Sequence, residues 1–126
     1  MEYILVDSSI WMDHFRIQNE LLIDLLNKQL VSTHPLIITE IACGSLKDRK
    51  KTISDLNLLP KASQPGHKDI LDFIEREKLF SQGCGTIDIT LLASTLTTPQ
   101  TKLWTLDKRL KELARRFGVM YRQTLH

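Results

Sequence analysis

Short apolar runs alternate along the chain with segments in which apolar residues recur at helical spacing. Residues 3–6 (Tyr-Ile-Leu-Val) and 102–106 (Lys-Leu-Trp-Thr-Leu) have the length and composition of buried strands. Between them, residues 19–30 and 69–79 place their apolar side chains on one face of a helix. Short strands separated by helices predict an α/β fold with a mainly parallel sheet.

Residues 35–45 fit two patterns. The β-branched run at 37–39 (Ile-Ile-Thr) favours a strand, because such side chains suit extended backbone. Pro35 and the continuation at 40–42 (Glu-Ile-Ala) instead suit a helix, whose first turn accommodates proline. Strand and helix both stay open for this segment.

Length and apolar content bound the number of domains. The chain has 126 residues and is 42% hydrophobic, which is enough for one core and too little for two ordinary domains. No run approaches the ~20 consecutive apolar residues of a membrane span. Residues 1–9 contain neither a basic leader nor a small-residue cleavage site. We therefore expect one domain over residues 1–126, in a cytoplasmic protein without a membrane anchor.

Cysteine spacing and net charge narrow the class of protein. Cys43 and Cys84 stand alone, and no histidine lies at zinc-ligand spacing from either, which disfavours a zinc site or a disulfide framework. The net charge of +2 is far from that of a nucleic-acid coat protein. Basic residues do gather within 107–126, where a solvated helix face and a phosphate-binding surface are both open interpretations.

Four of the 15 carboxylates interrupt apolar segments, whereas most others lie among charged neighbours. They are Asp7, Glu40, Asp88 and Asp107. Asp7 and Asp107 follow the two strand-like runs, so in a parallel sheet both would emerge where open α/β folds form their ligand crevice. Asp88 follows the glycine-containing turn 83–87, and neither Asp88 nor Glu40 has a basic neighbour in sequence. We expect the four acids to converge on one place.

Helix capping is a second interpretation, because aspartate is a common N-cap after a strand. It suits each of the three aspartates taken singly. It does not suit Glu40, an unpaired acid within an apolar segment, so a shared site explains the set better. Asp24 is different: it lies four residues before Lys28, opposite an apolar stripe, where a surface position is expected.

Four carboxylates in one crevice would repel one another. A pair about 4 Å apart costs about 4 kcal/mol at an effective dielectric constant of about 20, so a cation is needed to offset the repulsion. Oxygen ligands without His or Cys select Mg²⁺ or Mn²⁺ over zinc. Such ions activate water and stabilise the leaving oxygen in phosphodiester hydrolysis. The pattern therefore predicts a metal-dependent phosphodiesterase.

Four segments, taken in order, resemble the VapC-type toxins of the PIN-domain family. They are Asp-Ser-Ser-Ile-Trp at 7–11, Glu-Ile-Ala-Cys-Gly at 40–44, Gly-x-Gly-x-x-Asp at 83–88 and Leu-Trp-Thr-x-Asp-Lys-Arg-Leu at 103–110. Each motif is weak alone, but their combination is specific and spans nearly the whole chain. One departure is Ile89-Thr90, where relatives commonly carry small and His-like residues. It bears on substrate detail rather than on the metal site.

The resemblance implies a PIN-like three-layer α/β/α sandwich with a short, mainly parallel sheet surrounded by helices. It implies that the four acids are the catalytic and metal-binding residues, taking Mg²⁺ or Mn²⁺, with Ser9 and Thr105 as supporting hydroxyls. The implied function is that of an endoribonuclease that hydrolyses RNA phosphodiester bonds and inhibits translation, as the toxin of a toxin–antitoxin pair.

The resemblance also implies partners: a homodimer, and a cognate antitoxin of VapB type whose C-terminal tail occupies the acidic groove. Contacts to RNA phosphates would come from basic side chains, and the candidates are Arg16, Lys47, Arg49, Lys108 and Arg109. For His14, at the end of a predicted helix, a structural role is favoured over a contact with RNA.

Two other classes compete with this interpretation. The first class is a phosphoryl-transfer or phosphoacceptor α/β domain. A haloacid-dehalogenase-like enzyme would carry a second aspartate at position 9, where this chain has Ser9. A receiver-like domain would not place Asp88 after a glycine turn. The second class is a catalytically inactive PIN-fold module that binds RNA or protein. All four acids are present, so a loss of catalysis would have no visible cause, and this class is kept as the alternative.

Overall fold

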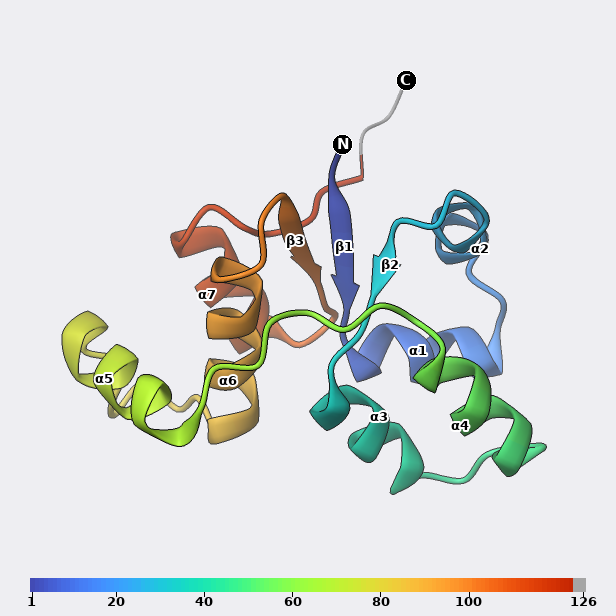
Figure 1. The fold of residues 1–126 in the computed structure, drawn as a ribbon, viewed down its shortest axis with the longest axis horizontal. Coiled ribbons are helices and arrows are strands. Elements are labelled where there is room, and N and C mark those ends of the chain that lie inside the picture. The colour runs from blue at the N-terminus through green and yellow to red at the C-terminus, as the bar shows by residue number, and fades with distance from the viewer. Residues whose placement is uncertain (124–126) are drawn as a thin grey trace.

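Three short parallel strands form the centre of the protein. The computed structural model describes residues 1–123, so the end of the basic segment 107–126 lies outside the described residues. The strands β1 (Tyr3–Val6), β2 (Val31–Ser32) and β3 (Thr101–Trp104) are ordered β2-β1-β3, with Leu5 opposite both Ser32 and Leu103. The central strand is therefore the first in sequence (Figure 1).

Helices form the connections between the strands and surround the sheet. They are α1 (Ser8–Arg16), α2 (Glu20–Asn27), α3 (Pro35–Ala42), α4 (Arg49–Asn57), α5 (His67–Glu77), α6 (Thr86–Leu96) and α7 (Lys108–Arg116). In Figure 1, α6 and α7 lie on the β3 side of the sheet, α2 lies on the β2 side, and α5 lies beyond α6. The α/β fold with a parallel sheet is confirmed and is consistent with the expected sandwich. Among residues 1–123, no helix is long and apolar enough to cross a membrane.

Two hydrophobic clusters hold the elements together. The larger one joins all three strands to α1, α2, α3, α4, α6 and α7, with Leu5, Ile37 and Leu103 fully buried. The smaller one packs α5 against α6 and α7 through residues such as Phe73 and Leu92. The apolar faces expected for residues 19–30 and 69–79 are the faces that the helices α2 and α5 bury.

The ambiguous segment 35–45 is a helix, α3, with Pro35 in its first turn. His34 caps it, because its Nδ1 accepts a hydrogen bond from the backbone N–H of Leu36 at 3.0 Å. Ile37 and Ile41 are spaced by one helical turn and both are fully buried. The helical spacing of these two side chains outweighs the β-branched run.

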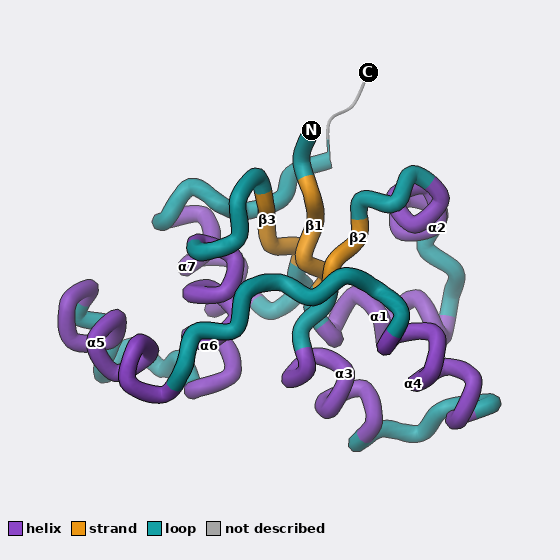
Figure 2. The backbone as a smooth tube through the Cα atoms, in the orientation of Figure 1, coloured by secondary structure: helices purple, strands orange, loops and turns teal. Residues whose placement is uncertain are grey.

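The loop between α4 and α5, residues 58–66, crosses the molecule near the ends of the strands (Figure 2). It extends the sheet by one bridge, in which Thr33 donates to Pro60 and accepts from Ala62 through the backbone. Hydroxyl groups of α6 fasten its far end, where Ser94 donates to the carbonyl of Ser63. The loop thus connects the two halves of the helical shell.

Candidate active site

The topology places two of the predicted acids at neighbouring strand ends. Asp7 directly follows β1, and Asp107 follows β3 by three residues. From β1 the chain passes to β2 on one side of β1, and later to β3 on the other side. The ends of β1 and β3 therefore flank a topological switch point. Open α/β sheets bind their ligands at such points.

Asp7 is held by two hydroxyl groups. Its side chain is only 5% exposed, and its Oδ2 accepts hydrogen bonds from Ser9 Oγ and Thr105 Oγ1, each at 2.7 Å. It occupies the N-cap position of α1 but makes no capping hydrogen bond. In the described part of the chain, Oδ1 accepts no hydrogen bond. The capping interpretation therefore does not account for Asp7.

Thr105 and Ser9 also connect the two strand-end loops. The backbone N–H of Asp107 donates to Thr105 Oγ1 at 3.0 Å, and the N–H of Leu106 donates to Ser9 Oγ at 3.0 Å. Asp107 itself caps α7, since its Oδ1 accepts from the N–H of Leu110 at 2.9 Å. For Asp107 the capping interpretation is correct, and the cap fixes the orientation of this carboxylate.

The other two acids come from helices. Glu40 lies exposed on α3 and accepts a hydrogen bond from Ser8 Oγ at 2.9 Å, at the start of α1. Asp88 lies half-buried in the first turn of α6, where the N-cap residue is Gly85, so Asp88 is not the cap. Ser8 was not expected from the sequence as a contact of Glu40, and only the packing of α1 against α3 reveals it.

Three of the acids act electrostatically on the fourth, Asp88. The pKa of Asp88 is raised above its ordinary value of 3.8, first by burial and then by the negative charges of Asp107, Asp7 and Glu40, with Arg109 opposing the shift. Charges on three separate elements thus reach one carboxyl. These charge effects support the expected convergence of the four acids, which stays a prediction.

A relative of this chain identifies its family. The chain is 37% identical over 116 residues to Ribonuclease VapC32 of Mycobacterium tuberculosis, in an alignment that covers 92% of this chain and 94% of that protein. The same figures hold for the protein from two strains of that organism. The chain belongs to the VapC ribonuclease family. No family model matches it, but the resemblance to VapC-type ribonucleases is confirmed by this relative.

The donor chemistry of this VapC site suits a hard divalent cation. All four side chains offer carboxylate oxygens, and Asp7 keeps one oxygen free of hydrogen bonds within the described residues. A cation there would relieve the repulsion that raises the pKa of Asp88. Within residues 1–123, however, no three His, Cys, Asp or Glu side chains are grouped closely enough to hold a metal ion as they stand.

The basic candidates for RNA contact fall into two groups. Arg49 donates to the carbonyls of Ala42 and Gly44, and Arg109 donates to the carbonyl of Gly83, so both guanidinium groups are engaged in the fold. No hydrogen bond or ion pair engages the side chains of the other three within the described residues: these are Arg16, Lys47 and Lys108.

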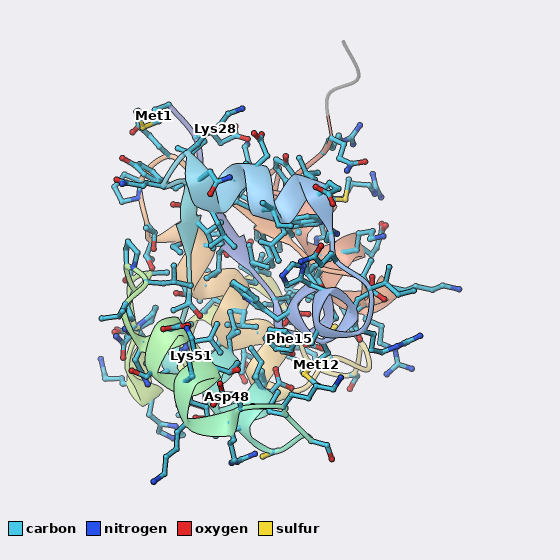
Figure 3. All side chains as sticks on the ribbon, turned by 90° about the vertical axis from the view of Figure 1, so that its right-hand side faces the viewer. Met1, Met12, Phe15, Lys28, Asp48 and Lys51 are labelled. Atoms are coloured by element: carbon cyan, nitrogen blue, oxygen red, sulfur yellow. The ribbon has the colours of Figure 1, made fainter. Side chains whose placement is uncertain are left out.

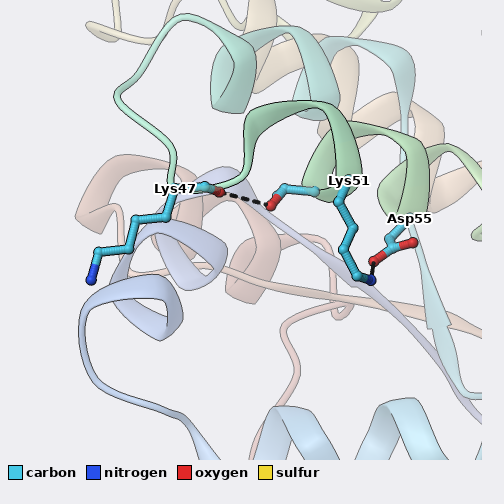
Figure 4. Close-up of polar contacts among 4 residues, drawn as sticks. Lys47, Lys51 and Asp55 are labelled. Atoms are coloured by element: carbon cyan, nitrogen blue, oxygen red, sulfur yellow. Dashed lines mark hydrogen bonds and ion pairs between the residues drawn. The ribbon is translucent and has the colours of Figure 1, made fainter.

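Two of these three cations line one hollow. Arg16 and Lys47 border a hollow of about 420 Å³ together with Met12 and Phe15, which lie near each other on the side shown in Figure 3. The Lys47 carbonyl accepts from Thr52, while its side chain points away from the neighbouring Lys51–Asp55 ion pair (Figure 4). This hollow offers apolar surface and positive charge together.

His14 has a structural role. Its Nδ1 accepts a hydrogen bond from the backbone N–H of Asn19 at 2.9 Å, which fastens the turn between α1 and α2. Its ring also meets Trp11 edge-on, with the ring centroids 6.2 Å apart. The structural interpretation of this histidine is supported, and Asn19 in turn caps α2.

Proposed function

We propose that this VapC chain is a metal-dependent endoribonuclease that cleaves RNA phosphodiester bonds as the toxin of a toxin–antitoxin pair. The observation that carries the proposal is the electrostatic coupling of Asp88 to Asp107, Asp7 and Glu40 at the switch point of the sheet. The relative named as a ribonuclease supports the chemistry and disfavours an inactive binding module.

Asp7, Glu40, Asp88 and Asp107 would hold Mg²⁺ or Mn²⁺. A bound ion of this kind lowers the pKa of a water molecule and neutralises charge on the phosphate. The chain's own hydroxyl groups orient the acids: Ser9 and Thr105 fix one oxygen of Asp7, and Ser8 turns Glu40 toward the start of α1. These hydrogen bonds reduce the conformational freedom that the carboxylates would lose on binding an ion.

The proposed partners follow from the family and from the charges. Single-stranded RNA would meet Arg16, Lys47 and Lys108, whose side chains no hydrogen bond or ion pair engages within residues 1–123. The cognate antitoxin would be of VapB type, with a basic side chain in the acidic groove, and the active form would be a homodimer. We propose that a single domain over residues 1–126 carries these roles.

The test is the substitution Asp7→Asn, which is nearly isosteric. The amide oxygen of asparagine can still accept from Ser9 and Thr105, so the fold should be kept. The loss of one carboxylate charge should reduce cleavage of a sensitive RNA at matched Mg²⁺ by a factor of at least about 100, in the range that loss of one key electrostatic group costs. Toxicity in cells should disappear with it.

Asp24→Asn is the matched control, since Asp24 is exposed and, among residues 1–123, its side chain pairs with Lys28 alone, at 2.9 Å. This variant should cleave RNA at the rate of the parent. Circular dichroism and size-exclusion chromatography should show parent-like structure for both variants. Undiminished cleavage by Asp7→Asn would refute the proposed mechanism.

A further inference from the structure

Arg109 connects α7 to the loop in front of α6. Its Nη1 donates a hydrogen bond of 2.7 Å to the carbonyl of Gly83, a residue 26 positions earlier in the chain. Gly83 has a φ of +76°, in the left-handed region that favours glycine. A Cβ at this position would lie 3.1 Å from both Cζ and Nη1 of Arg109. The guanidinium therefore rests directly on the glycine backbone.

Each residue of this contact lies close in sequence to one of the acids. Arg109 follows Asp107 by two residues within the first turn of α7, and Gly83 precedes Asp88 by five residues. Asp107 is anchored by its cap on Leu110, whose side chain is fully buried. The Arg109–Gly83 hydrogen bond is thus a direct connection between the segment that carries Asp107 and the segment that carries Asp88.

The same contact distinguishes Arg109 from the other basic candidates. The Nη1 group of Arg109 donates to the Gly83 carbonyl, so part of its guanidinium holds the loop. Among the five candidates, Arg109 contacts the loop that leads to Asp88.

We propose that Arg109 is a positioning residue of the acidic site: it latches the Gly83 loop to α7 and so sets the separation of Asp88 and Asp107 for a divalent cation. The proposal rests on the proposed function, because it assigns the latch to the same metal site. The expectation that Arg109 contacts RNA phosphates stays a prediction, and the RNA-binding experiment below tests it against the latch.

The test compares Arg109→Gln with Gly83→Ala. The first removes the hydrogen bond, and the second keeps every charge but pushes the guanidinium away with a methyl group. Each should weaken Mn²⁺ binding, measured by titration calorimetry, by about 10-fold or more, as loss of a residue that supports metal ligands does. The double variant should bind Mn²⁺ no more weakly than the worse single variant, because both changes break one contact.

Two control variants separate the latch from general effects. Gly118→Ala also places alanine at a positive φ, +72°, but its Cβ would have no neighbour within 4 Å. Arg115→Gln removes an arginine from the same helix, where it pairs with Glu112. Both should retain the Mn²⁺ affinity of the parent. An equal loss in Gly118→Ala and Gly83→Ala would assign the effect to backbone strain and overturn the latch.

RNA binding distinguishes the latch from a phosphate contact. In metal-free protein, Arg109→Gln should leave the log–log salt slope of single-stranded RNA binding unchanged. A phosphate contact would instead reduce that slope by about 0.7 and leave Mn²⁺ affinity intact, which would overturn the proposal.

A metal-independent readout keeps the latch separate from the proposed function. The ¹⁵N order parameter of the Gly83 amide should fall in Arg109→Gln and stay parent-like in Arg115→Gln. If the parent neither bound Mn²⁺ nor cleaved RNA, the proposed function would fail, while a reduced order parameter would still support the latch. An unchanged order parameter in Arg109→Gln would overturn the latch by itself.

Discussion

At Asp88, burial and like charge act in the same direction. Both raise the pKa of its carboxyl, so ionising Asp88 is less favourable in the folded chain than in the unfolded one. A group with a raised pKa contributes stability that is complete below its ordinary value of 3.8 and is lost as the pH rises through the folded pKa. At neutral pH the ionised Asp88 therefore destabilises the metal-free fold.

Replacing Asp88 with asparagine should raise the melting temperature of the protein in EDTA at pH 7. The substitution removes the charge that Asp107, Asp7 and Glu40 repel. In the parent, Mg²⁺ at 100 times its dissociation constant should add about 2.7 kcal/mol of stability. Asp88→Asn should gain much less from Mg²⁺, because it has lost a ligand. Differential scanning calorimetry with and without Mg²⁺ measures both effects.

Asp24→Asn again provides the control, because it breaks an exposed ion pair with Lys28 and relieves no repulsion. Its melting temperature in EDTA should not rise. A lower melting temperature for Asp88→Asn in EDTA would contradict the electrostatic account of the cluster.

Individual site residues differ in how far the sequence predicts them. Asp7 and Asp107 are predictable because each follows an apolar run, and the carboxyl ends of parallel strands share one edge. The contacts Ser8–Glu40 and Arg109–Gly83 span 32 and 26 positions and depend on how helices pack, which local periodicity does not encode. The sequence leaves N-capping open for all three aspartates. Only the local geometry shows that Asp107 makes a capping hydrogen bond and Asp7 does not.

Among the elements, α3 carries Glu40 and depends on an unusual cap. His34 is buried, and burial lowers the pKa of its imidazole below the ordinary value of 6.5. Its Nδ1 accepts the capping hydrogen bond from Leu36, so the neutral ring carries its proton on Nε2. Nε2 is buried and has no hydrogen-bond partner in the described structure. Protonation of Nδ1 would remove the cap of α3.

The contribution of His34 to the free energy of unfolding should therefore fall as the pH is lowered below 6.5. His34 binds a proton in the unfolded chain before it does so in the folded one, so its contribution is present above 6.5 and is lost as the pH falls through the folded pKa. One such group changes the free energy of unfolding by at most about 1.4 kcal/mol per pH unit. Urea denaturation of the metal-free parent and of His34→Asn between about pH 5 and 7 measures this contribution as the difference between their slopes.

His34→Asn keeps a capping oxygen and removes the titrating ring, so its stability should depend less on pH in this range. His67→Asn, at the exposed start of α5, should keep the pH dependence of the parent. Identical slopes for the parent and His34→Asn would show that another group is responsible.

Two elements show where sequence patterns stop being sufficient. The segment of α3 was ambiguous because β-branched residues occur in buried helices as well as in strands, and the burial of Ile37 and Ile41 decides the matter. The pairing of Thr33 with residues 60–62 had no signal in sequence, because an isolated bridge has no periodicity. The strand expected at 102–106 begins one residue earlier and ends at Trp104, so Thr105 is free to reach Asp7.

Across the whole molecule, the excess positive charge is small, and some of the cationic side chains are engaged by other groups of the protein. Several cations are used internally: Arg49 and Arg109 bind carbonyls, Lys28 pairs with Asp24, and Lys51 pairs with Asp55. Fewer cations are therefore available to a polyanion than the sequence alone indicates. Arg16, Lys47 and Lys108 are the candidates whose side chains the described structure leaves unengaged.

Salt dependence of RNA binding tests this division of the charges. In metal-free protein, three phosphate contacts predict a log–log slope of about −2 for single-stranded RNA, since each contributes about −0.7. Lys47→Gln and Lys108→Gln should each make the slope shallower by about 0.7. Arg49→Gln should not change it, because Arg49 is occupied by Ala42 and Gly44, and Lys28→Gln is the exposed control. Fluorescence anisotropy between about 50 and 200 mM salt gives the slopes. A slope near zero for the parent, or a loss in Arg49→Gln equal to that in Lys47→Gln, would refute this assignment of the RNA-binding surface.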